Sequence, residues 1–467
     1  MNDEKNFLIC HGKKFFYTCM MIMISAVIGA LALMVVYTLP TTGNMFKNAQ
    51  QGRLIYEKEE VYPSWAPGNT SAYWDNYTDS IMLRTALFPE VNGVVHDAML
   101  NPRYCLFQDL DSTCSEDMDT VFGTFQTNKD EDVIGSILEE LKGNIQNMQV
   151  SYYSRYWNGY LVWLKPLLLA MPISQIRMWN GMLQICLACY LFCLIFQKLG
   201  IRYSWAFLLS YLALNPISVA ISFQFSDMFY LLAGFSIYVL HHEEMILSQS
   251  RYIYIYMMAM AGILTAYFDF LTYPLVSYGF PMTMLILLAY KGHRMKRRVD
   301  GVVFAVTGGT FWCLGYGGMY ISKWIMSWLL TGHNTWAEAV GQTMYRMSGS
   351  LSGREGSQVF SVWEVIDRNV GILAKDPAIL LFLVFLAILL WKMRRYHQRR
   401  RAPECISAMF GLLLLSVAPF VWLAVFANHS WLHCWMTYRE LSLFIFAFGS
   451  LFIVILEDKE THGARGM

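Results

Sequence analysis

The sequence predicts an all-α polytopic membrane protein with about ten transmembrane helices and a large first extracytoplasmic loop that carries interfacial helices. Three observations support this prediction. Of the 467 residues, 56% are hydrophobic and 15% are charged, whereas about 25% of the residues of a typical soluble domain are charged. The hydrophobic residues form long runs, and Lys and Arg collect in alternate connections between these runs. Because the two signs of charge are segregated along the chain, the net charge of +1 conceals this pattern, and we expect membrane lipid and no nucleic acid as a partner.

Residues 15–38 form the first apolar run, which follows the basic pair Lys13 and Lys14. At about 1.5 Å per residue, a helix over this run is longer than the roughly 30 Å hydrocarbon core of a bilayer. Pro40 follows without the small-residue pattern of a signal-peptide cleavage site. We therefore expect residues 1–38 to form a cytoplasmic N-terminus and an uncleaved first transmembrane helix.

Residues 39–173 are predicted to form the first extracytoplasmic loop. Between residues 40 and 155 the chain holds 17 Asp and Glu against 8 Lys and Arg, together with several turn-forming Pro and Gly residues. Such a composition is typical of a region that faces water.

Three segments of this loop are predicted to be helices that do not cross the membrane. Residues 79–88 and 132–148 have apolar residues at helical spacing, which is typical of short amphipathic helices at a membrane surface. Residues 160–173 are apolar but include Lys165 and Pro166, and they are too few to cross the bilayer comfortably. For this segment we predict a re-entrant or interfacial helix.

Further apolar runs complete the predicted set of about ten spans. The organisation that follows is transmembrane helices 2–7 in residues 174–321, an extracytoplasmic flap loop in residues 322–377, and transmembrane helices 8–10 with a cytoplasmic tail in residues 378–467. The runs cover residues 174–197, 204–223, 227–241, 252–268, 272–290, 302–320, 378–392, 406–426 and 435–456.

The basic residues predict the orientation of these spans. Short loops rich in Lys and Arg stay in the cytoplasm, so both termini are predicted to be inside and the acidic first loop outside. Within the later external loop, residues 348–357 are rich in Gly and Ser and predict either a mobile flap over a site or a disordered connector. The basic connections contain Lys198, Arg202, Arg251, Lys291, Arg294, Lys296, Arg297, Arg298, Lys392, Arg394, Arg395, Arg399, Arg400 and Arg401.

Two carboxylates of the first loop are candidate catalytic residues. Asp75 and Asp79 are four residues apart, which places them on one face of a helix. A carboxylate that Trp74 and Tyr77 partly shield from water at a membrane surface has a raised pKa and can act as a general base. The alternative is that Asp75 or Thr78 caps the helix that follows.

Asp227 and Asp269 each stand at the external mouth of a predicted span. Because an ionisable group at membrane depth is costly, such residues usually line a polar cavity or meet a partner. Helix capping explains Asp227 equally well, whereas the aromatic residues and Pro274 near Asp269 indicate an unwound helix end beside a cavity. Both residues are candidates for substrate binding.

Four external residues complete the candidate binding site. Arg155 and Asn158 lie among aromatic residues at the interface, where a guanidinium fork can hold a phosphate. Arg439 is expected about one turn inside the final span, with a carboxylate or a phosphate as partner. His429 stands near it at the external end. For both arginines the alternative is that they reach the membrane surface within an aromatic belt.

No metal site is predicted, although a divalent cation stays possible. Cys186, Cys189 and Cys193 have helical spacing, but no histidine accompanies them, so they are expected to be small apolar residues. His429 lies four residues before His433 without an evident third ligand. In the first loop, Cys105 and Cys114 form a disulfide if their compartment is oxidising, and the sequence leaves this open.

The arrangement as a whole resembles the GT-C superfamily of membrane glycosyltransferases, which take sugars from polyprenyl-phosphate carriers on the outer side of the membrane. The resemblance covers nearly the whole chain and includes the inside N-terminus, the acidic first loop with interfacial helices, and the later external flap. Shorter segments are similar to bacterial glucosyltransferases that decorate surface polysaccharide. These segments are residues 74–83, 153–160, 268–274 and 428–439.

The resemblance implies an inverting sugar transfer at the outer face of a bacterial cytoplasmic membrane. Asp75 or Asp79 is the implied general base, and Arg155 and Arg439 are implied to stabilise the departing phosphate. The implied partners are a polyprenyl-phosphate-linked sugar donor and a glycan or lipid-linked acceptor. The sequence leaves open two alternatives, which are a polysaccharide polymerase or ligase of the cell envelope and a transporter of lipid-linked glycans.

Overall fold

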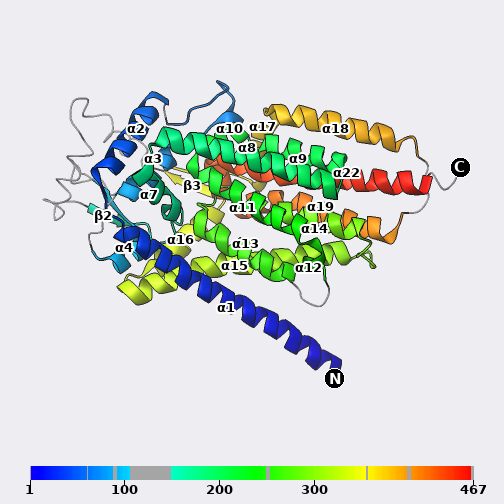
Figure 1. Ribbon diagram of the computed structural model, residues 1–467, viewed down its shortest axis with the longest axis horizontal. Helices are drawn as coiled ribbons and strands as arrows, with labels where there is room; N and C mark the ends of the chain where they lie inside the picture. The colour runs from blue at the N-terminus through cyan, green and yellow to red at the C-terminus, as the bar shows by residue number, and fades with distance from the viewer. Residues whose placement is uncertain are drawn as a thin grey trace.

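The computed structural model describes residues 2–59, 61–87, 92–105, 149–248, 253–353, 356–396 and 401–463. Long helices run side by side along the longest dimension of the molecule (Figure 1), which confirms the predicted all-α class. The described strands form two small antiparallel pairs, β1 with β2 and β3 with β4.

The elements before the middle of the chain are α1 (Asn2–Thr38), α2 (Gly43–Glu59), the 3-10 helix η1 (Thr70–Ala72), α3 (Asn76–Leu87), α4 (Val94–Leu100), β1 (Pro102–Cys105), β2 (Gln149–Tyr152), α7 (Leu161–Ala170), α8 (Ile173–Lys198), α9 (Ile201–Ala213), α10 (Pro216–Ile221) and α11 (Phe223–His241). The later elements are α12 (Glu243–Ile246), α13 (Ile253–Phe268), α14 (Val276–Lys291), α15 (Asp300–Thr331), α16 (Thr335–Met347), β3 (Ser350–Gly353), β4 (Gly356–Val359), α17 (Val362–Ala374), α18 (Pro377–Met393), α19 (Pro403–Val425), α20 (Ala427–Leu432), α21 (Cys434–Thr437), η3 (Tyr438–Glu440) and α22 (Leu441–Gly463).

Six helical stretches among the described residues are long and apolar enough to cross a membrane. A seventh span results if α17 and α18, which are bent by 87° at their junction, count as one. The chain is therefore a polytopic helical membrane protein. The number of about ten spans stays a prediction, because α9, α13, α14 and α18 have 13, 16, 16 and 17 residues and reach less than the roughly 30 Å of a hydrocarbon core. The six stretches are Gly12–Thr38, Ile173–Lys198, Phe223–His241, Asp300–Thr331, Pro403–Val425 and Cys434–Thr461.

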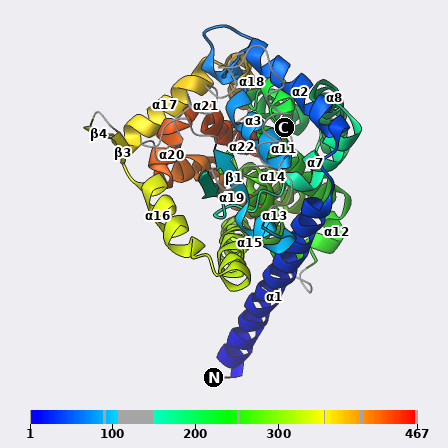
Figure 2. The same ribbon diagram turned by 90° about the vertical axis from the view of Figure 1, so that its left-hand side faces the viewer.

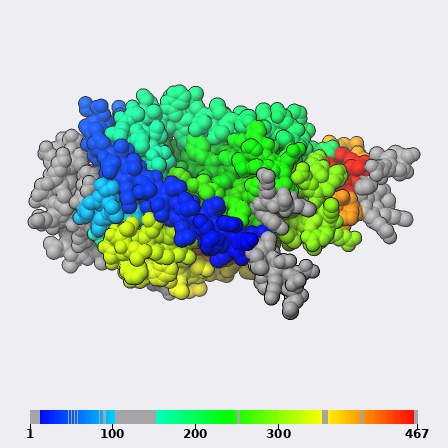
Figure 3. All heavy atoms as spheres, turned by 60° about the horizontal axis from the view of Figure 1, so that its bottom comes forward, coloured from blue at the N-terminus to red at the C-terminus, as the bar shows by residue number. Residues whose placement is uncertain are grey.

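Helix α1 contains the predicted first span and lies along the outside of the bundle (Figure 3). Its apolar residues Val27, Leu31 and Val35 are more than half exposed. An unbroken apolar face of this kind is stable only against lipid or a protein partner, which agrees with the predicted membrane location.

The basic connections gather at one end of the bundle. Arg202, which follows α8, is 2.7 Å from Glu460 near the end of α22, and Lys291 at the end of α14 is 2.8 Å from Glu457. The beginning of α1 and the end of α22 also lie toward this end, opposite α2 and α3 (Figure 1). This arrangement agrees with the charge pattern from which a cytoplasmic location of this end was predicted.

The run 204–223, predicted to be one span, is two helices. The chain breaks between α9 and α10 at Asn215, which has a positive φ of 60° and precedes Pro216. Proline has no N–H for the helix ladder, and asparagine tolerates the left-handed conformation that turns the chain. The Asn215 side chain then caps α10 by accepting the N–H of Ser218 and also accepts the indole N–H of Trp65 at 2.9 Å.

Helix α15 continues well past residue 320, where the sequence predicted a span to end. It has 32 residues and reaches into the region 322–377 that was predicted to be an external loop. Lys323 does not end the helix because its ammonium is buried and donates to the carbonyl oxygen of Ala98 at 3.0 Å. A lysine that meets a protein carbonyl inside the structure is not exposed to lipid.

The remainder of the predicted flap loop has regular structure. Helix α16, the β3–β4 hairpin and α17 form an arc at the end of the bundle (Figure 2). The hairpin pairs Ser350 with Val359, and α17 begins with a capping box between Ser361 and Glu364. The backbone of residues 354–355, at the tip of the hairpin, lies outside the described residues.

The predicted interfacial helices at residues 79–88 and 160–173 correspond to α3 and α7. Helix α7 packs against α1, α2 and α3. It is therefore part of the folded core at this end of the bundle. The third predicted amphipathic helix, at residues 132–148, lies outside the described residues.

Glycines bring the central helices of the bundle into close contact. A Cβ atom on Gly262 of α13 would lie 2.1 Å from the carbonyl oxygen of Trp312, and one on Gly315 of α15 would lie 2.1 Å from that of Ala259. Small residues at such crossings let helix backbones touch, which is how helices commonly associate in membranes. The backbones of α13 and α15 therefore pack directly against each other.

Candidate functional site

Asp75 stands directly before α3 and is 1% exposed. Its carboxylate accepts hydrogen bonds from the N–H (2.9 Å) and the hydroxyl (3.0 Å) of Thr78, and from the side-chain amide of Gln224 on α11 (2.6 Å). Burial raises the pKa of Asp75, although these hydrogen bonds oppose the rise. The helix-capping alternative for Asp75 is therefore present in the structure.

Asp79, in the first turn of α3, is fully buried. Its carboxylate meets the N-terminus of α11. The N–H of Phe223 donates to both carboxylate oxygens at 3.0 Å, and the Ser222 hydroxyl (3.2 Å) and the Gln224 N–H (3.4 Å) donate to Oδ1. Burial raises the pKa of Asp79 to about 7, while the charge of Arg177 and the Phe223 N–H lower it. Such a pKa suits a general base, yet these oxygens also satisfy the free N–H groups at the start of a membrane helix.

Arg177, which the sequence analysis did not single out, lies beside this pair. Its Nη1 atom is 2.9 Å from Oε2 of Glu59, and its Nη2 atom donates to Asn76 at 2.8 Å. The arginine joins α8 to α2 and to the first turn of α3. The available signal was a lone cation near the start of an apolar run, where a partner is required.

A cavity of about 290 Å³ lies between α15, α16 and the segment before α7, and we name it the cationic cavity. Two of its lining residues are arginines and none is acidic. The guanidinium groups of Arg155 and Arg346 lie 5.6 Å and 5.4 Å from the centre of the Tyr156 ring. Its lining residues are Arg155, Tyr156, Leu271, Tyr316, Gly317, Tyr320, Ile321, Trp324, Ala339, Gln342, Thr343, Arg346 and Phe426.

The two arginines of the cationic cavity differ in their partners. Arg155 forms an ion pair with Glu338 at 2.8 Å. Within the described part of the chain, Arg346 forms no hydrogen bond or ion pair, and its buried Nη1 atom lacks an acceptor. A guanidinium with a buried N–H group that lacks an acceptor favours the binding of an anion. Arg346 lies within the region 322–377 that the sequence predicted to be a flap loop, and only the fold places it beside Arg155.

Asn158 has a structural position close to this cavity. It adopts a positive φ of 57° at the start of α7, and its side-chain amide donates to the carbonyl oxygen of Tyr156 at 3.3 Å. The next residue, Gly159, donates its N–H to the carbonyl oxygen of Tyr267 at 3.0 Å. Asn158 thereby fixes the turn that carries Arg155 and Tyr156, while its binding of substrate stays a prediction.

Asp269 lies beside the cationic cavity, in the turn after α13. Its carboxylate accepts the N–H groups of Leu271 and Thr272 at 2.9 Å each, and the Thr272 hydroxyl at 2.5 Å. Burial raises the pKa of Asp269 to about 6, although the Thr272 hydroxyl and N–H oppose the rise. Tyr320, which lines the cavity, donates to the main-chain oxygen of Asp269 at 3.3 Å.

His429 contacts the same turn. Its Nε2 atom is 2.7 Å from the carbonyl oxygen of Leu271, and its ring centre is 4.7 Å from that of His433. Burial lowers the pKa of His429, and the nearby His433 and Arg346 lower it further, so the imidazole is neutral at neutral pH. A neutral His429 donates through Nε2 to Leu271 and thereby supports one wall of the cationic cavity.

Arg439 contacts the scaffold of the protein. Its guanidinium donates to the carbonyl oxygens of Leu214 (2.9 Å), Trp435 (2.5 Å) and Tyr73 (3.1 Å), and it lies 4.3 Å from the centre of the Phe225 ring. The expected carboxylate or phosphate partner is replaced by main-chain carbonyls within the described residues. Arg439 thus joins the end of α9, the chain before Asp75 and the final membrane helix.

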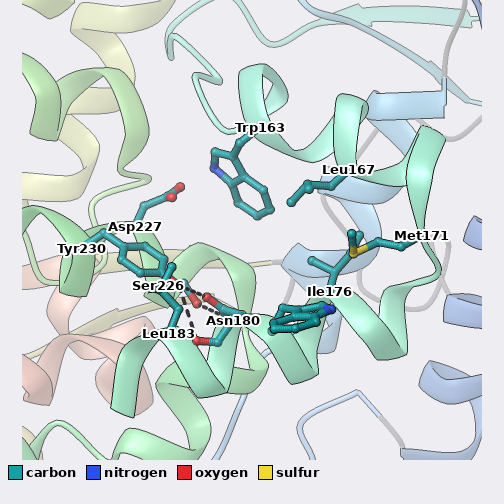
Figure 4. A pocket seen from close by; sticks show the side chains of 10 residues that line it. Trp163, Leu167, Met171, Ile176, Asn180, Leu183, Ser226, Asp227 and Tyr230 are labelled. Carbon is teal, nitrogen blue, oxygen red and sulfur yellow. Dashed lines mark hydrogen bonds between the residues drawn. The ribbon is translucent and has the colours of Figure 1, made fainter. Parts of the chain in front are cut away.

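Asp227 lies in a second cavity, of about 530 Å³, between α7, α8 and α11 (Figure 4). We name it the acidic cavity because Asp227 is its only charged lining residue. Asp227 stands in the second turn of α11, whose start is bonded by Asp79, so the capping alternative for Asp227 does not hold. The lining residues are Trp163, Leu167, Met171, Ile176, Trp179, Asn180, Leu183, Ser226, Asp227 and Tyr230.

The described residues contain no group of three or more His, Cys, Asp and Glu side chains that is placed to hold a metal ion. Cys186, Cys189 and Cys193 are exposed free thiols on the outer face of α8. The disulfide between Cys105 and Cys114, which the sequence left open, lies outside the described side chains.

Comparison with known proteins adds no relative, since no family model, curated protein or solved structure matches the chain. The fold defines a polytopic helical membrane protein, and its described residues form the cationic and the acidic cavity at the end of the bundle opposite the chain termini. Around the cationic cavity the structure brings together Arg155, Asp269 and His429. It places Asp75 and Asp79 at the start of α11, Asp227 in the acidic cavity, and Arg439 in the scaffold.

Proposed function

We propose that this protein is a GT-C-type glycosyltransferase of a bacterial cytoplasmic membrane. It moves a sugar from a polyprenyl-phosphate carrier to an extracytoplasmic glycan or lipid-linked acceptor. The observation that carries the proposal is the cationic cavity, in which two guanidinium groups contact one aromatic ring without an acidic lining residue.

The phosphate of the donor suits the charge of this cavity. Arg346 has a buried donor atom without an acceptor within the described residues, and Arg155 lies across the same tyrosine ring. Charge-assisted hydrogen bonds from guanidinium to phosphate are among the strong polar contacts in proteins. As the bond to the sugar breaks, negative charge grows on the phosphate, and the two arginines stabilise it most at that stage.

The carrier lipid suits the side of the cavity that faces the membrane. Ile321 lines the cavity from α15 and is 42% exposed, and Trp328 and Leu329 continue the exposed apolar surface along the same helix. An apolar surface next to a cationic cavity fits a molecule that is isoprenoid at one end and anionic at the other.

The proposed reaction is an inverting displacement. A carboxylate takes the proton of the acceptor hydroxyl, the hydroxyl oxygen forms a bond to the anomeric carbon, and the bond from that carbon to the phosphate oxygen breaks. Polyprenyl phosphate leaves with the electron pair, and the proton stays on the carboxylate until water removes it.

Three carboxylates compete for the role of general base. Asp75 and Asp79 are the first-loop residues that the resemblance implies, and their raised pKa values favour proton uptake. Their oxygens already accept hydrogen bonds from the start of α3 and the start of α11. Asp269 has a pKa raised to about 6 and lies beside the wall of the cationic cavity, so it is a third candidate base, although its oxygens also accept hydrogen bonds from Leu271 and Thr272.

The test measures sugar transfer by the full chain in membrane vesicles that receive a panel of polyprenyl-phosphate sugars. We expect release of polyprenyl phosphate with one of these donors, and a loss of at least about 100-fold in Arg346→Gln. Among Asp75→Asn, Asp79→Asn and Asp269→Asn, the variant of the base loses transfer but keeps donor binding. Absence of transfer with every donor, or full activity of all four variants at normal protein levels, contradicts the proposal.

The polymerase or ligase alternative required Arg439, His429 and Arg155 to converge away from the acidic pair. Arg439 instead donates to Tyr73, two residues before Asp75, while His429 contacts Leu271 at the cationic cavity. This separation gives the alternative no support from the geometry of the described residues.

A further inference from the structure

The acidic cavity has an apolar body that opens toward the membrane. Seven of its ten lining side chains are hydrophobic or aromatic, and α7, α8 and α11 each contribute to it. Trp179 and Leu183, on the outer face of α8, are 55% and 52% exposed. Its volume of about 530 Å³ lies within the range of roughly 300–1,000 Å³ typical of ligand sites. A hydrocarbon chain can therefore enter this cavity sideways from lipid.

One wall of the cavity is polar and has its hydrogen bonds satisfied. The side-chain amide of Asn180 donates to the hydroxyl of Ser226 at 2.7 Å and to the carbonyl oxygen of Ala220 at 2.6 Å. The hydroxyl of Tyr230 donates to the side-chain oxygen of Asn180 (Figure 4). These groups hold α8 against α11 and need no ligand.

Asp227 differs from this wall. Its buried Oδ2 atom lies near the indole N–H of Trp163, which interacts with the carboxylate, although neither of these two atoms forms a hydrogen bond of normal geometry within the described residues. In Figure 4 its carboxylate points toward the indole of Trp163, at the inner end of the cavity. The poorly satisfied carboxylate and indole N–H favour a ligand hydroxyl that donates to Asp227 and accepts from Trp163.

The charge of the cavity restricts the ligand further. Its lining residues include one carboxylate and no Lys or Arg. A phosphate or a carboxylate in this place would find no compensating cation among the lining residues, and an unpaired negative charge in an apolar surrounding is costly. The head group that fits is neutral and donates a hydrogen bond.

We propose that the acidic cavity binds a neutral amphiphile, with its prenyl or acyl chain between α7 and α8 and its hydroxyl donating to Asp227. The binding itself is independent of the transferase activity. Identification of this hydroxyl compound as the sugar acceptor, or as the lipid portion of it, rests on the proposed function. The protein would then hold its anionic donor and its neutral acceptor in two cavities of opposite charge.

Photolabelling of the full chain in phospholipid nanodiscs tests the proposal. Three diazirine probes of equal chain length are compared: a farnesol analogue, the corresponding farnesyl phosphate, and the corresponding hydrocarbon without a head group. Labelled positions are found by peptide mass spectrometry, with unlabelled farnesol as competitor. We expect the farnesol probe to label the α7, α8 and α11 peptides about fivefold more than either other probe, as one hydrogen bond to a buried acceptor predicts. We expect farnesyl phosphate to label α15 and α16.

Two variants separate the parts of the proposal. Leu183→Trp changes a half-exposed side chain and fills the cavity, so it reduces farnesol labelling of the three helices about tenfold. Asp227→Leu removes the acceptor, so labelling by farnesol and by the hydrocarbon becomes equal. Leu183→Trp is expected to fold, because Leu183 lies on the outer face of α8. It therefore still tests the proposal if Asp227→Leu does not fold.

Several results would overturn the inference. Equal labelling of the wild-type cavity by farnesol and the hydrocarbon would show that any lipid chain fills it. Equal labelling by farnesol and farnesyl phosphate would remove the argument from charge. If the cavity takes no farnesol while Arg346→Gln still abolishes transfer, this inference fails and the proposed function stands. If farnesol labels the cavity but no donor supports transfer, the proposed function fails and the binding site stands.

Discussion

The cationic and the acidic cavity, at the end of the bundle opposite the chain termini, share a construction but differ in charge. Each lies between a long apolar helix and a shorter element, and each has exposed apolar residues on its outer side. The cationic cavity contains two arginines and no acidic residue, whereas the acidic cavity contains one aspartate and no Lys or Arg.

This difference indicates that the ligands differ in the head group and not in the chain. Apolar walls accept any hydrocarbon because the hydrophobic effect is non-directional. Inside a medium of low dielectric constant, a single charge decides which head group is tolerated. The contrast between the cavities can therefore be tested by substitutions that change one charged or polar group at a time.

The largest effect is expected from Arg346→Gln. The substitution removes the guanidinium that lacks an acceptor, so kcat/KM for the polyprenyl-phosphate sugar should fall by roughly 100- to 1,000-fold. Arg368→Gln is the matched control. Arg368, on α17, lies over the ring of Trp431 on α20 and does not line the cavity. Equal losses in both variants would mean that the effect comes from overall positive charge.

A smaller effect, on stability, is expected from Asn180→Ala in the wall of the acidic cavity. The substitution leaves the Tyr230 hydroxyl and the Ala220 carbonyl without a side-chain partner, so the free energy of unfolding should fall by about 2 kcal/mol. Thermal unfolding in detergent measures this change. Asn44→Ala, at an exposed position of α2, should stay within about 0.5 kcal/mol of the wild type. A stable Asn180→Ala protein would show that the wall does not depend on this network.

The start of α11, which carries the acidic cavity, should respond to pH through Asp79. Its pKa is raised to about 7 in the folded protein and has an ordinary value when unfolded, so the folded state binds the proton more tightly. The stability from this group is therefore complete at low pH and is lost as the pH rises toward 7. We expect the unfolding midpoint of the wild type to fall by a few degrees more than that of Asp79→Asn across this interval.

Asp367→Asn, which removes an exposed carboxylate on α17, controls for the change in net charge in this pH experiment. Its pH profile should follow that of the wild type. Identical slopes for the wild type and Asp79→Asn would mean that the Asp79 carboxyl is not protonated in the folded protein near neutral pH.

The smallest effect is expected from Glu338→Gln, which removes the ion-pair partner of Arg155. Because Glu338 is 37% exposed, the pair contributes little, and the KM for the donor should change by about threefold or less with kcat unchanged. The change should disappear at high salt, because salt screens exposed charges. A loss comparable to that of Arg346→Gln would show that α16 depends on this ion pair for its position.

The sequence determined the class of the protein and the segregation of its basic connections. Long apolar runs and segregated basic residues predict a helical membrane protein whose basic connections lie together, because the bilayer imposes both features on any chain that crosses it. The helices α3 and α7 were also predictable from spacing and length. Each of these features depends on local composition alone.

The tertiary structure decided which polar residues share a cavity. Residues 155 and 346 are far apart in the chain, and only the packing of α16 beside α15 brings their guanidinium groups to one ring. Likewise, the Asp79 carboxylate accepts a hydrogen bond from the start of α11, and Asp227, in the second turn of that helix, lines a cavity. Arg439 donates to main-chain carbonyls of three segments. Hydrogen bonds and charges act over a few ångströms, so their partners follow from the folded chain and not from the order of residues.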